Sequence, residues 1–316
     1  MTDLSSPPIK AGSRGLLRLI SPSGAVPEPD RVHRAQERLQ ELGFRIQLDS
    51  HALSRVQRFS GTDTQRVQAL HRAARGTARV VMATRGGYGL SRILHKLDYA
   101  LLRDGINERR QFWVGHSDFT ALQLAVLAQT GAVTYSGPMA AHDFGAEKLD
   151  DITVDSFLDA LDGSQEAIGF ASDDAPRGLD RAGVLWGGNL SLVTSLIGTP
   201  YLPKARGVLF LEDVAEQPYR VERMFAQLLL AGVLQRQKAI VLGAFTDYRL
   251  SAHDSGFDLA TAVAWLRSQL KASGVPVVTG LPFGHVRTKL TLPHGARCRL
   301  VRDGTEAYLV FPHGHD

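Results

Sequence analysis

The sequence predicts an α/β fold whose N-terminal domain is a doubly wound, parallel sheet of the flavodoxin or Rossmann type. Short apolar runs alternate with helix-like stretches from Leu16 to about Pro138, and this alternation is typical of such sheets. The run 80–83 is apolar at every position, as expected for a strand buried on both faces. At 316 residues the chain is also long enough for two domains, because single cores stop growing near ~250 residues.

Composition indicates an ordinary globular protein with a weakly basic balance. Hydrophobic residues make up 44% of the chain, charged residues 22%, and the formal net charge is +4. The basic residues form no run, so we expect no nucleic-acid partner. Residues 1–8 lack the features of a secretory signal and no long apolar window occurs, which predicts a cytoplasmic protein without membrane contact. The single cysteine, Cys298, excludes an intramolecular disulfide and a Cys-based zinc cluster.

The elements of the first half follow from their patterns in chain order. Val32, Ala35 and Leu39 share one face of a helix expected at 29–42, and Gly43 ends it. A helix at 64–74 takes its cap from the segment 62–64. The other strands expected here are 16–20, 44–48, 112–115 and a short strand and turn at 133–138, and the other helices are 90–97, one beginning just after residue 118, and 153–161.

The second half begins after a polar connector. Residues 169–180 contain few core formers, so we expect an N-terminal domain with its connector at 1–170 and a β-rich α/β C-terminal domain at 171–316. The expected strands are 183–187, 207–211, 239–245 and 275–280, followed by short antiparallel strands at 289–292, 296–301 and 307–311, and the expected helices are 190–197, 220–230 and 259–270.

A glycine-rich turn, residues 84–89, follows the strand 80–83 directly. Gly86, Gly87 and Gly89 carry no Cβ, so their backbone N–H groups can approach a ligand closely. The spacing matches neither a Walker loop nor the dinucleotide fingerprint, and no acidic residue is placed to bind a ribose, so we expect no nucleotide cofactor. An oxyanion-binding turn and a tight turn without a ligand both remain open here.

Ser117 stands where the strand 112–115 gives way to a helix, the position at which α/β enzymes place nucleophiles. Ser117 and Asp118 are also residue types that commonly cap helices, which is the structural alternative. Because parallel strands share one carboxyl edge, we expect the turn 84–89 to lie beside Ser117.

A nucleophilic serine needs a base, and the base needs a third group to orient it. His285 follows Gly284 in a turn after an apolar strand, from which an imidazole can project into a cleft. His116 adjoins Ser117 in sequence, but neighbouring side chains on a sharp turn usually point apart, so we expect His285 to be the base.

Glu212 ends the apolar strand 208–211 and can therefore be held rigidly near the boundary between the domains. Its alternative role is an ion pair with Arg220 or Arg223. Asp213 and Glu216 are close enough in sequence to compete for the orienting role.

Six segments, taken together and in order, resemble the LD-carboxypeptidase family of serine peptidases. The resemblance covers roughly residues 15–311. The segments are 85–89, 115–121, 136–139, 185–190, 211–213 with 220–224, and 279–281 with 283–285.

The resemblance implies a role for eight residues. The implied catalytic triad is Ser117, Glu212 and His285. The implied oxyanion hole uses backbone N–H groups of Gly86, Gly87 and Asp118. The implied substrate contacts are Trp186 and Asn189, although Asn189 is also suited to cap the helix that follows it. No metal and no cofactor are expected.

The implied reaction removes the terminal D-alanine of a murein tetrapeptide, free or sugar-linked, at an L-to-D amide bond during peptidoglycan recycling. His285 would take the Ser117 proton, and backbone donors would hold the oxyanion. A neighbouring branch of the family, the microcin C7 self-immunity proteins, cleaves a peptidyl nucleotide and is one alternative. A non-catalytic peptide-binding module is another. The resemblance also implies a homodimer.

Overall fold

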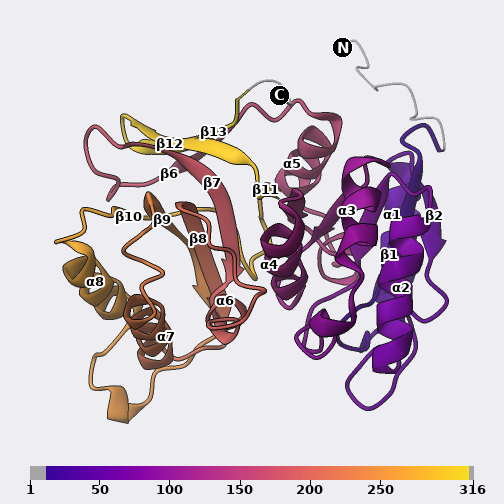
Figure 1. Ribbon diagram of the computed structural model, residues 1–316, viewed down its shortest axis with the longest axis horizontal. Coiled ribbons are helices and arrows are strands. Elements are labelled where there is room, and N and C mark those ends of the chain that lie inside the picture. Colours follow the sequence, from indigo (N-terminus) through magenta and orange to yellow (C-terminus); the bar gives the residue numbers. More distant parts are fainter. Residues whose placement is uncertain (1–11, 313–316) are drawn as a thin grey trace.

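The computed structural model describes residues 12–312 and arranges them around two sheets (Figure 1). The N-terminal stretch 1–8, on which the sequence argument about a secretory signal rests, lies outside the described residues. Among residues 12–312, no helix is long and apolar enough to cross a membrane.

The first sheet is six-stranded, with the order β11-β5-β4-β3-β1-β2, and it confirms the predicted doubly wound parallel domain. All its strands are parallel except β11, which pairs antiparallel with β5. Its strands are β1 (Leu16–Ile20), β2 (Arg45–Leu48), β3 (Val80–Ala83), β4 (Phe112–Gly115), β5 (Thr134–Ser136) and β11 (Leu292–His294). Its helices are α1 (Pro29–Glu41), α2 (Asp63–Arg75), α3 (Tyr99–Asn107), α4 (Phe119–Thr130) and α5 (Asp151–Asp162), with short turns η1 (Leu94–Lys96) and η2 (Ala140–Phe144).

Both faces of this sheet are covered, which explains the unbroken apolar run of β3. Val81 and Ala83 belong to one hydrophobic cluster, whereas Val80 and Met82 belong to another on the opposite face. Because successive side chains of a strand alternate between faces, a strand between two helical layers needs apolar residues at every position.

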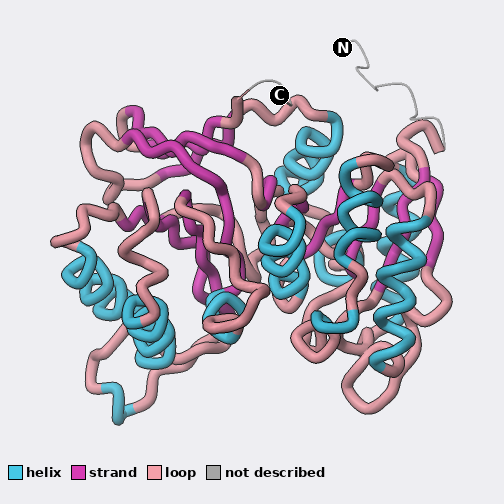
Figure 2. Tube along the Cα trace, in the orientation of Figure 1, coloured by secondary structure: helices cyan, strands magenta, loops and turns pink. Residues whose placement is uncertain are grey.

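The second sheet is seven-stranded, with the order β10-β9-β8-β7-β12-β13-β6, so its parallel half is joined to an antiparallel half. Helices α7 and α8 lie side by side along one side of it (Figure 2). Its strands are β6 (Ala167–Ala171), β7 (Asp180–Asn189), β8 (Gly207–Val214), β9 (Ala239–Thr246), β10 (Val277–Thr279), β12 (Arg297–Asp303) and β13 (Glu306–Val310). Its helices are α6 (Leu190–Ser195), α7 (Pro218–Leu230) and α8 (Leu259–Leu270), with the short turn η3 (Ala252–Asp254).

Two strands cross the expected division of the chain. The expected boundary at residue 170 falls within β6, which already pairs with β13 of the second sheet. β11 returns from the second half to the first sheet, where Leu292 pairs with Ser136. The loop before β11 carries His285, so this loop is anchored to both sheets.

One expected helix is largely absent. Residues 90–97 contain only the short turn η1 rather than a full α-helix. The backbone N–H of Leu90 donates to the Asp118 carboxylate at 3.0 Å, which ties the start of this segment to the neighbouring strand-helix turn. The prediction of a full helix here was wrong: the backbone bonds from Ile93 to Leu90 and from Lys96 to Ile93 span three residues, so the segment forms 3₁₀-type turns.

Candidate active site

Ser117 lies on the sharp turn between β4 and α4. Residues 116–118 make the whole connection, and the backbone of Ser117 has φ +62°, in the left-handed region that residues other than glycine rarely adopt. Such strain costs about 1–3 kcal/mol and recurs where a turn presents a nucleophile above a sheet. α4 begins without a side-chain cap hydrogen bond, so the capping alternative for Ser117 and Asp118 is wrong.

The glycine-rich turn after β3 lies against Ser117. A Cβ added to Gly86 would come within 2.6 Å of both Cβ and Oγ of Ser117, and within 3.1 Å of the Asp118 backbone nitrogen. Real Cβ atoms do not approach other atoms this closely, so only glycine fits at position 86. Gly87 has φ +104°, which again favours glycine. The expected neighbourhood of this turn and Ser117 is confirmed.

Gly86→Ala is expected to lower kcat/KM at least 100-fold, because the new methyl group must displace Ser117 or the turn that adjoins it. Steady-state peptidase kinetics measure the loss. Gly163→Ala is the matched control, since its φ is +75° and its Cβ would meet nothing within 4 Å. Gly163→Ala should lower the free energy of unfolding by about 1 kcal/mol and leave turnover unchanged. Equal turnover in both variants would contradict the assigned proximity.

Glu212 and His285 form a hydrogen-bonded pair where β8 approaches the loop after β10. The His285 Nδ1 to Glu212 Oε2 distance is 2.8 Å, and the Glu212 side chain is fully buried. The Asn189 amide also donates to Glu212 Oε1 at 3.3 Å from the adjacent strand β7. With Nδ1–H directed at the carboxylate, the Nε2 lone pair of His285 is left available to accept a proton. This is the arrangement of an oriented general base.

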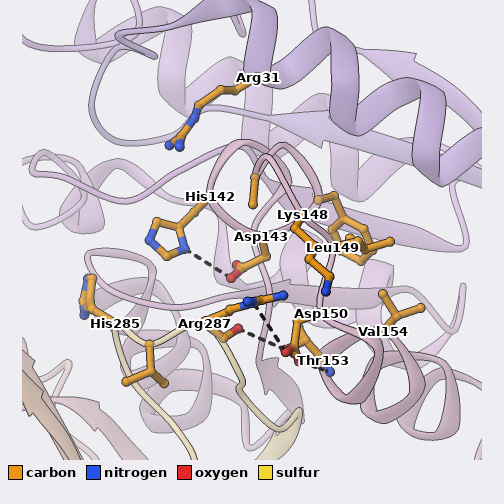
Figure 3. Close-up of a pocket in the computed structure, with 13 residues that line it drawn as sticks. Arg31, His142, Asp143, Lys148, Leu149, Asp150, Thr153, Val154, His285 and Arg287 are labelled. Atoms are coloured by element: carbon orange, nitrogen blue, oxygen red, sulfur yellow. Dashed lines mark hydrogen bonds and ion pairs between the residues drawn. The ribbon is translucent and has the colours of Figure 1, made fainter.

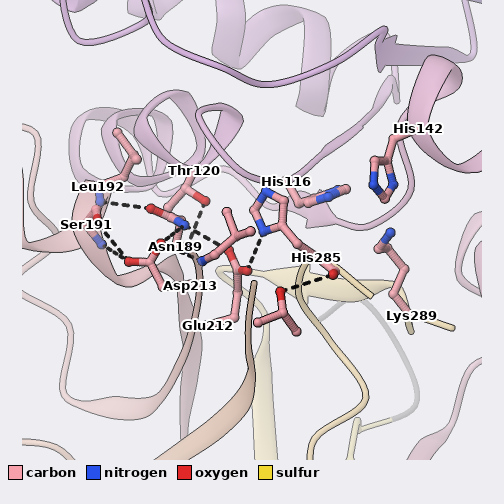
Figure 4. A network of polar contacts seen from close by, with 12 residues as sticks. His116, Thr120, His142, Asn189, Ser191, Leu192, Glu212, Asp213, His285 and Lys289 are labelled. Atoms are coloured by element: carbon pink, nitrogen blue, oxygen red, sulfur yellow. Dashed lines mark hydrogen bonds and ion pairs between the residues drawn. The ribbon is translucent and has the colours of Figure 1, made fainter. Parts of the chain in front are cut away.

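The two competing carboxylates make other contacts, and Figure 4 shows those of Asp213. Asp213 accepts hydrogen bonds from the backbone N–H and hydroxyl of Ser191 at 2.9 and 2.7 Å, and from the Asn189 amide at 2.9 Å. Burial raises the pKa of Asp213 above its ordinary value. Glu216 lies 3.8 Å from Arg220 at the start of α7. Within residues 12–312, Glu212 is thus the carboxylate that pairs with His285.

His116 connects these two parts of the site. Its backbone directly precedes Ser117, and its ring centroid lies 5.2 Å from that of His285. The ring is buried and its Nδ1 lies 2.9 Å from the Gly137 carbonyl oxygen, so Nδ1 carries the proton. Burial, followed by the nearby Lys289 ammonium, holds the pKa of His116 well below its ordinary value. A neutral His116 therefore packs between the serine turn and His285.

A buried ion pair lies behind His116. Lys289 is fully buried and its ammonium contacts Asp143, which also accepts hydrogen bonds from the Met139 backbone at 2.7 Å and from His142 at 3.1 Å. Burial acts to raise the pKa of Asp143, but the Lys289 charge and the His142 hydrogen bond outweigh it and hold this pKa far below its ordinary value. The pair fastens the His285 loop to η2 of the first domain.

The same region contains the one potential metal-binding group found among residues 12–312. His116, His142 and Asp143 place ligand atoms within 4.8 Å of one another. However, Asp143 already bonds the Lys289 ammonium, whose positive charge would repel a divalent cation. The chemistry of this donor set therefore favours a structural ion pair over a metal site.

Lys289→Met is expected to destabilise the protein by about 3–5 kcal/mol, because it leaves the Asp143 carboxylate buried without its counter-charge. Denaturant unfolding measures the loss, and adding Asp143→Asn should recover part of it. The depressed pKa of Asp143 also fixes the pH dependence. The ionised Asp143 carboxylate stabilises the folded protein at neutral pH, and this stabilisation is lost progressively as the pH falls below ~3.9, the pKa of an unfolded Asp. Lys289→Met protein that is as stable as wild type would contradict this assignment.

Trp186 and Asn189, which the resemblance implies as substrate contacts, do not line a substrate site in the way that was expected. Trp186 is fully buried, and its indole N–H donates to Gln237 at 3.1 Å, so the ring packs in the core and offers no surface to a ligand. Asn189 is 4% exposed and accepts from the Leu192 backbone at 3.2 Å as the cap of α6. The structure thus makes Trp186 a core residue and Asn189 a positioning residue for Glu212.

Two family descriptions match the chain on either side of the domain connection. The LD-carboxypeptidase N-terminal domain matches residues 17–137, and the LD-carboxypeptidase C-terminal domain matches residues 182–300. The chain belongs to the LD-carboxypeptidase family. Membership makes it a serine carboxypeptidase, a hydrolase, and agrees with the two-domain α/β architecture.

Individual relatives agree with the family assignment. A Bacillus subtilis protein named "Probable murein peptide carboxypeptidase" is 30% identical over 92% of this chain and 89% of its own length. The crystal structure of a muramoyltetrapeptide carboxypeptidase from Oxalobacter formigenes is 39% identical, with a TM-score of 0.86 over 95% of this chain and 100% of that one. The microcin C7 self-immunity protein MccF of Escherichia coli is 29% identical over 92% of both chains.

The residues that sequence reasoning missed are Asp143 and Lys289, which support the site from behind. A lone lysine in the strand-like run 289–292 was the available signal, because a charged residue in an apolar strand is either at an edge or buried with a partner. Its partner is 146 residues away in sequence, and only the fold brings them together.

Proposed function

We propose that the chain removes the terminal D-alanine from murein tetrapeptides, free or sugar-linked, by hydrolysing an L-to-D amide bond. The single observation that supports this most is the Glu212–His285 hydrogen bond beside the strained turn of Ser117. In the proposal Ser117 is the nucleophile, His285 the base and Glu212 the group that orients it. The likeness to murein peptide carboxypeptidases supports the choice of substrate.

The mechanism follows from the roles of these side chains. His285 Nε2 accepts the Ser117 hydroxyl proton while Oγ attacks the scissile carbonyl carbon. The resulting oxyanion accepts hydrogen bonds from backbone N–H groups of Gly86, Gly87 and Asp118. The C–N bond then breaks, and His285 returns the proton to the leaving amine of D-alanine. Water, deprotonated by His285, attacks the acyl-serine and releases the shortened peptide with Ser117 reprotonated.

A second candidate substrate is a peptidyl nucleotide. It is favoured by the similarity to MccF, of which one solved structure in complex with glutamyl sulfamoyl guanosine is 25% identical, with a TM-score of 0.81. The triad chemistry would be the same, because that reaction also opens an amide. Nucleotide recognition would need an aromatic ring for base stacking. The pocket that borders His285 is lined by two imidazoles and by one phenyl ring, that of Phe144, which is fully buried; neither Tyr nor Trp lines it.

Mass spectrometry of the products distinguishes these substrates. We expect a murein tetrapeptide to lose one alanine and a peptidyl nucleotide to remain intact under the same conditions. Cleavage of the nucleotide alone would transfer the proposal to the second substrate. Binding of both without turnover would indicate a peptide-binding module.

The remaining expectations concern assembly and location. We propose that the enzyme works as a cytoplasmic homodimer, with a division near residue 170 between the part that carries Ser117 and the part that carries Glu212 and His285. Light scattering of the purified protein measures the oligomeric state, and a monomeric mass at micromolar concentration would contradict the dimer.

A further inference from the structure

A pocket of about 300 Å³ opens beside His285 (Figure 3). His285 and Arg287 line it from the loop that precedes β11. Arg31 of α1 lines the opposite side, His142 comes from η2, and Lys148 comes from the segment between η2 and α5. The pocket therefore lies between two parts of the first domain and the His285 loop. Its volume is at the low end of ligand sites, which suits a single small residue.

The lining of the pocket is positively charged. It contains three permanent cations, Arg31, Lys148 and Arg287, and two carboxylates, Asp143 and Asp150. The charge of Asp143 is already balanced by Lys289 behind the pocket. The balance of charge in the pocket is therefore positive, and an anionic ligand fits it better than a neutral one.

The individual cations are only weakly paired. Arg287 lies 3.8 Å from Asp150, and the side chain of Arg287 is 60% exposed. Arg31 lies 3.7 Å from Glu28, whose side chain is 65% exposed. Lys148 has no carboxylate within ion-pair distance among residues 12–312. Exposed ion pairs at such distances contribute little, so these cations remain available to a ligand.

The chemistry of the reaction fixes which part of the substrate lies here. His285 Nδ1 is bonded to Glu212, so its Nε2 must deliver the proton to the leaving amine. The leaving residue therefore lies on the His285 side of the scissile bond, whereas the oxyanion lies toward the turn at Gly86. The leaving residue of a carboxypeptidase substrate always carries a free carboxylate.

We propose that the pocket beside His285 receives the leaving D-amino acid, and that Arg31, Lys148 and Arg287 bind its carboxylate. This inference rests on the proposed function. It also explains exopeptidase specificity, because a small pocket lined by cations favours one terminal residue and disfavours a neutral, extended chain.

A second group of cations lies around the turn at Gly86, against which Ser117 packs. Arg85 precedes the turn at Gly86 and donates to the Ala25 carbonyl at 2.7 Å. Burial, followed by the charges of Arg58 and Arg55, lowers the pKa of Arg85. These arginines adjoin the turn proposed to hold the oxyanion rather than His285. They therefore provide a comparison group for the test.

The test compares a tetrapeptide acid with the same peptide ending in D-alaninamide. Wild-type enzyme should prefer the acid by about 10–100-fold in kcat/KM, the range expected for charge-assisted hydrogen bonds to a carboxylate. Lys148→Met and Arg31→Met should each reduce this preference about fivefold or more, mainly through a higher KM for the acid. Arg58→Met and the distant Lys271→Met should retain the wild-type preference.

Two outcomes would overturn the inference while leaving the proposed function intact. One is wild-type enzyme that hydrolyses acid and amide equally well. The other is an acid preference that survives Lys148→Met and Arg31→Met but is lost in Arg58→Met. Circular dichroism of each variant verifies that it is folded.

Failure of the proposed function itself gives a different result. If wild type hydrolyses neither peptide, ligand-observed NMR on the Ser117→Ala protein still tests the pocket. D-Alanine should then bind more tightly than D-alaninamide, and Lys148→Met should weaken its binding severalfold. Equal binding of the two ligands, or binding unaffected by Lys148→Met, would contradict the assignment of the pocket.

Discussion

Ser117→Ala should lower kcat for D-alanine release by about four to six orders of magnitude, as removal of the nucleophile does in other serine peptidases. The substitution removes one oxygen and leaves the strained backbone at φ +62° in place. The fold and substrate binding should therefore persist. Discontinuous assays over long incubations are needed to measure so small a residual rate.

The control for this prediction is Ser164→Ala, because Ser164 is exposed just after α5 and its hydroxyl donates only weakly, at 3.2–3.3 Å, to Asp159. Its turnover should equal that of wild type, and both variants should unfold at the wild-type denaturant concentration. Turnover of Ser117→Ala within tenfold of wild type would show that another group is the nucleophile.

Glu212→Gln should lower kcat by about three to four orders of magnitude. The buried carboxylate accepts the Nδ1–H of His285 at 2.8 Å and stabilises the positive charge that the imidazole gains during proton transfer. A glutamine keeps the shape but removes the negative charge. Its amide group can also turn toward Nδ1 and favour the wrong tautomer. The loss should lie mainly in kcat, because Glu212 is screened from substrate by His285.

Glu216→Gln is the matched control for this substitution, because Glu216 pairs at 3.8 Å with Arg220, and both side chains are partly exposed. We expect its kcat to stay within about threefold of wild type, as for other surface ion pairs. A larger loss in Glu216→Gln than in Glu212→Gln would move the orienting role away from the His285 partner.

The fold was predictable where local pattern and tertiary environment agree. The four apolar residues of β3 indicated a strand with two covered faces, and the structure divides them between two hydrophobic clusters. The return of β11 to the first sheet was not predictable in this way. A three-residue strand carries little pattern, and its pairing with β5 depends on a segment more than 150 residues earlier.

The candidate site was likewise predictable from the sequence only in part. Ser117, Glu212 and His285 were candidates because each lies at or after the end of an apolar run, and the family resemblance then implied the role of each. The environment of Trp186 could not be inferred, since a tryptophan before two glycines is equally compatible with a cleft and with a core. The charges of Arg31, Lys148 and Arg287 come from three separate segments, so no sequence window brings them together.

One measurement tests the central claim most directly, namely that the Ser117 site hydrolyses an L-to-D bond. Two murein tetrapeptides that differ only in the chirality of the terminal alanine are incubated with wild-type enzyme, and alanine release is followed by mass spectrometry. The account predicts release of D-alanine from the first peptide, at least 100-fold slower release from the L-alanine peptide, and no release by Ser117→Ala. Equal release from both peptides, or release that persists in Ser117→Ala, would contradict it.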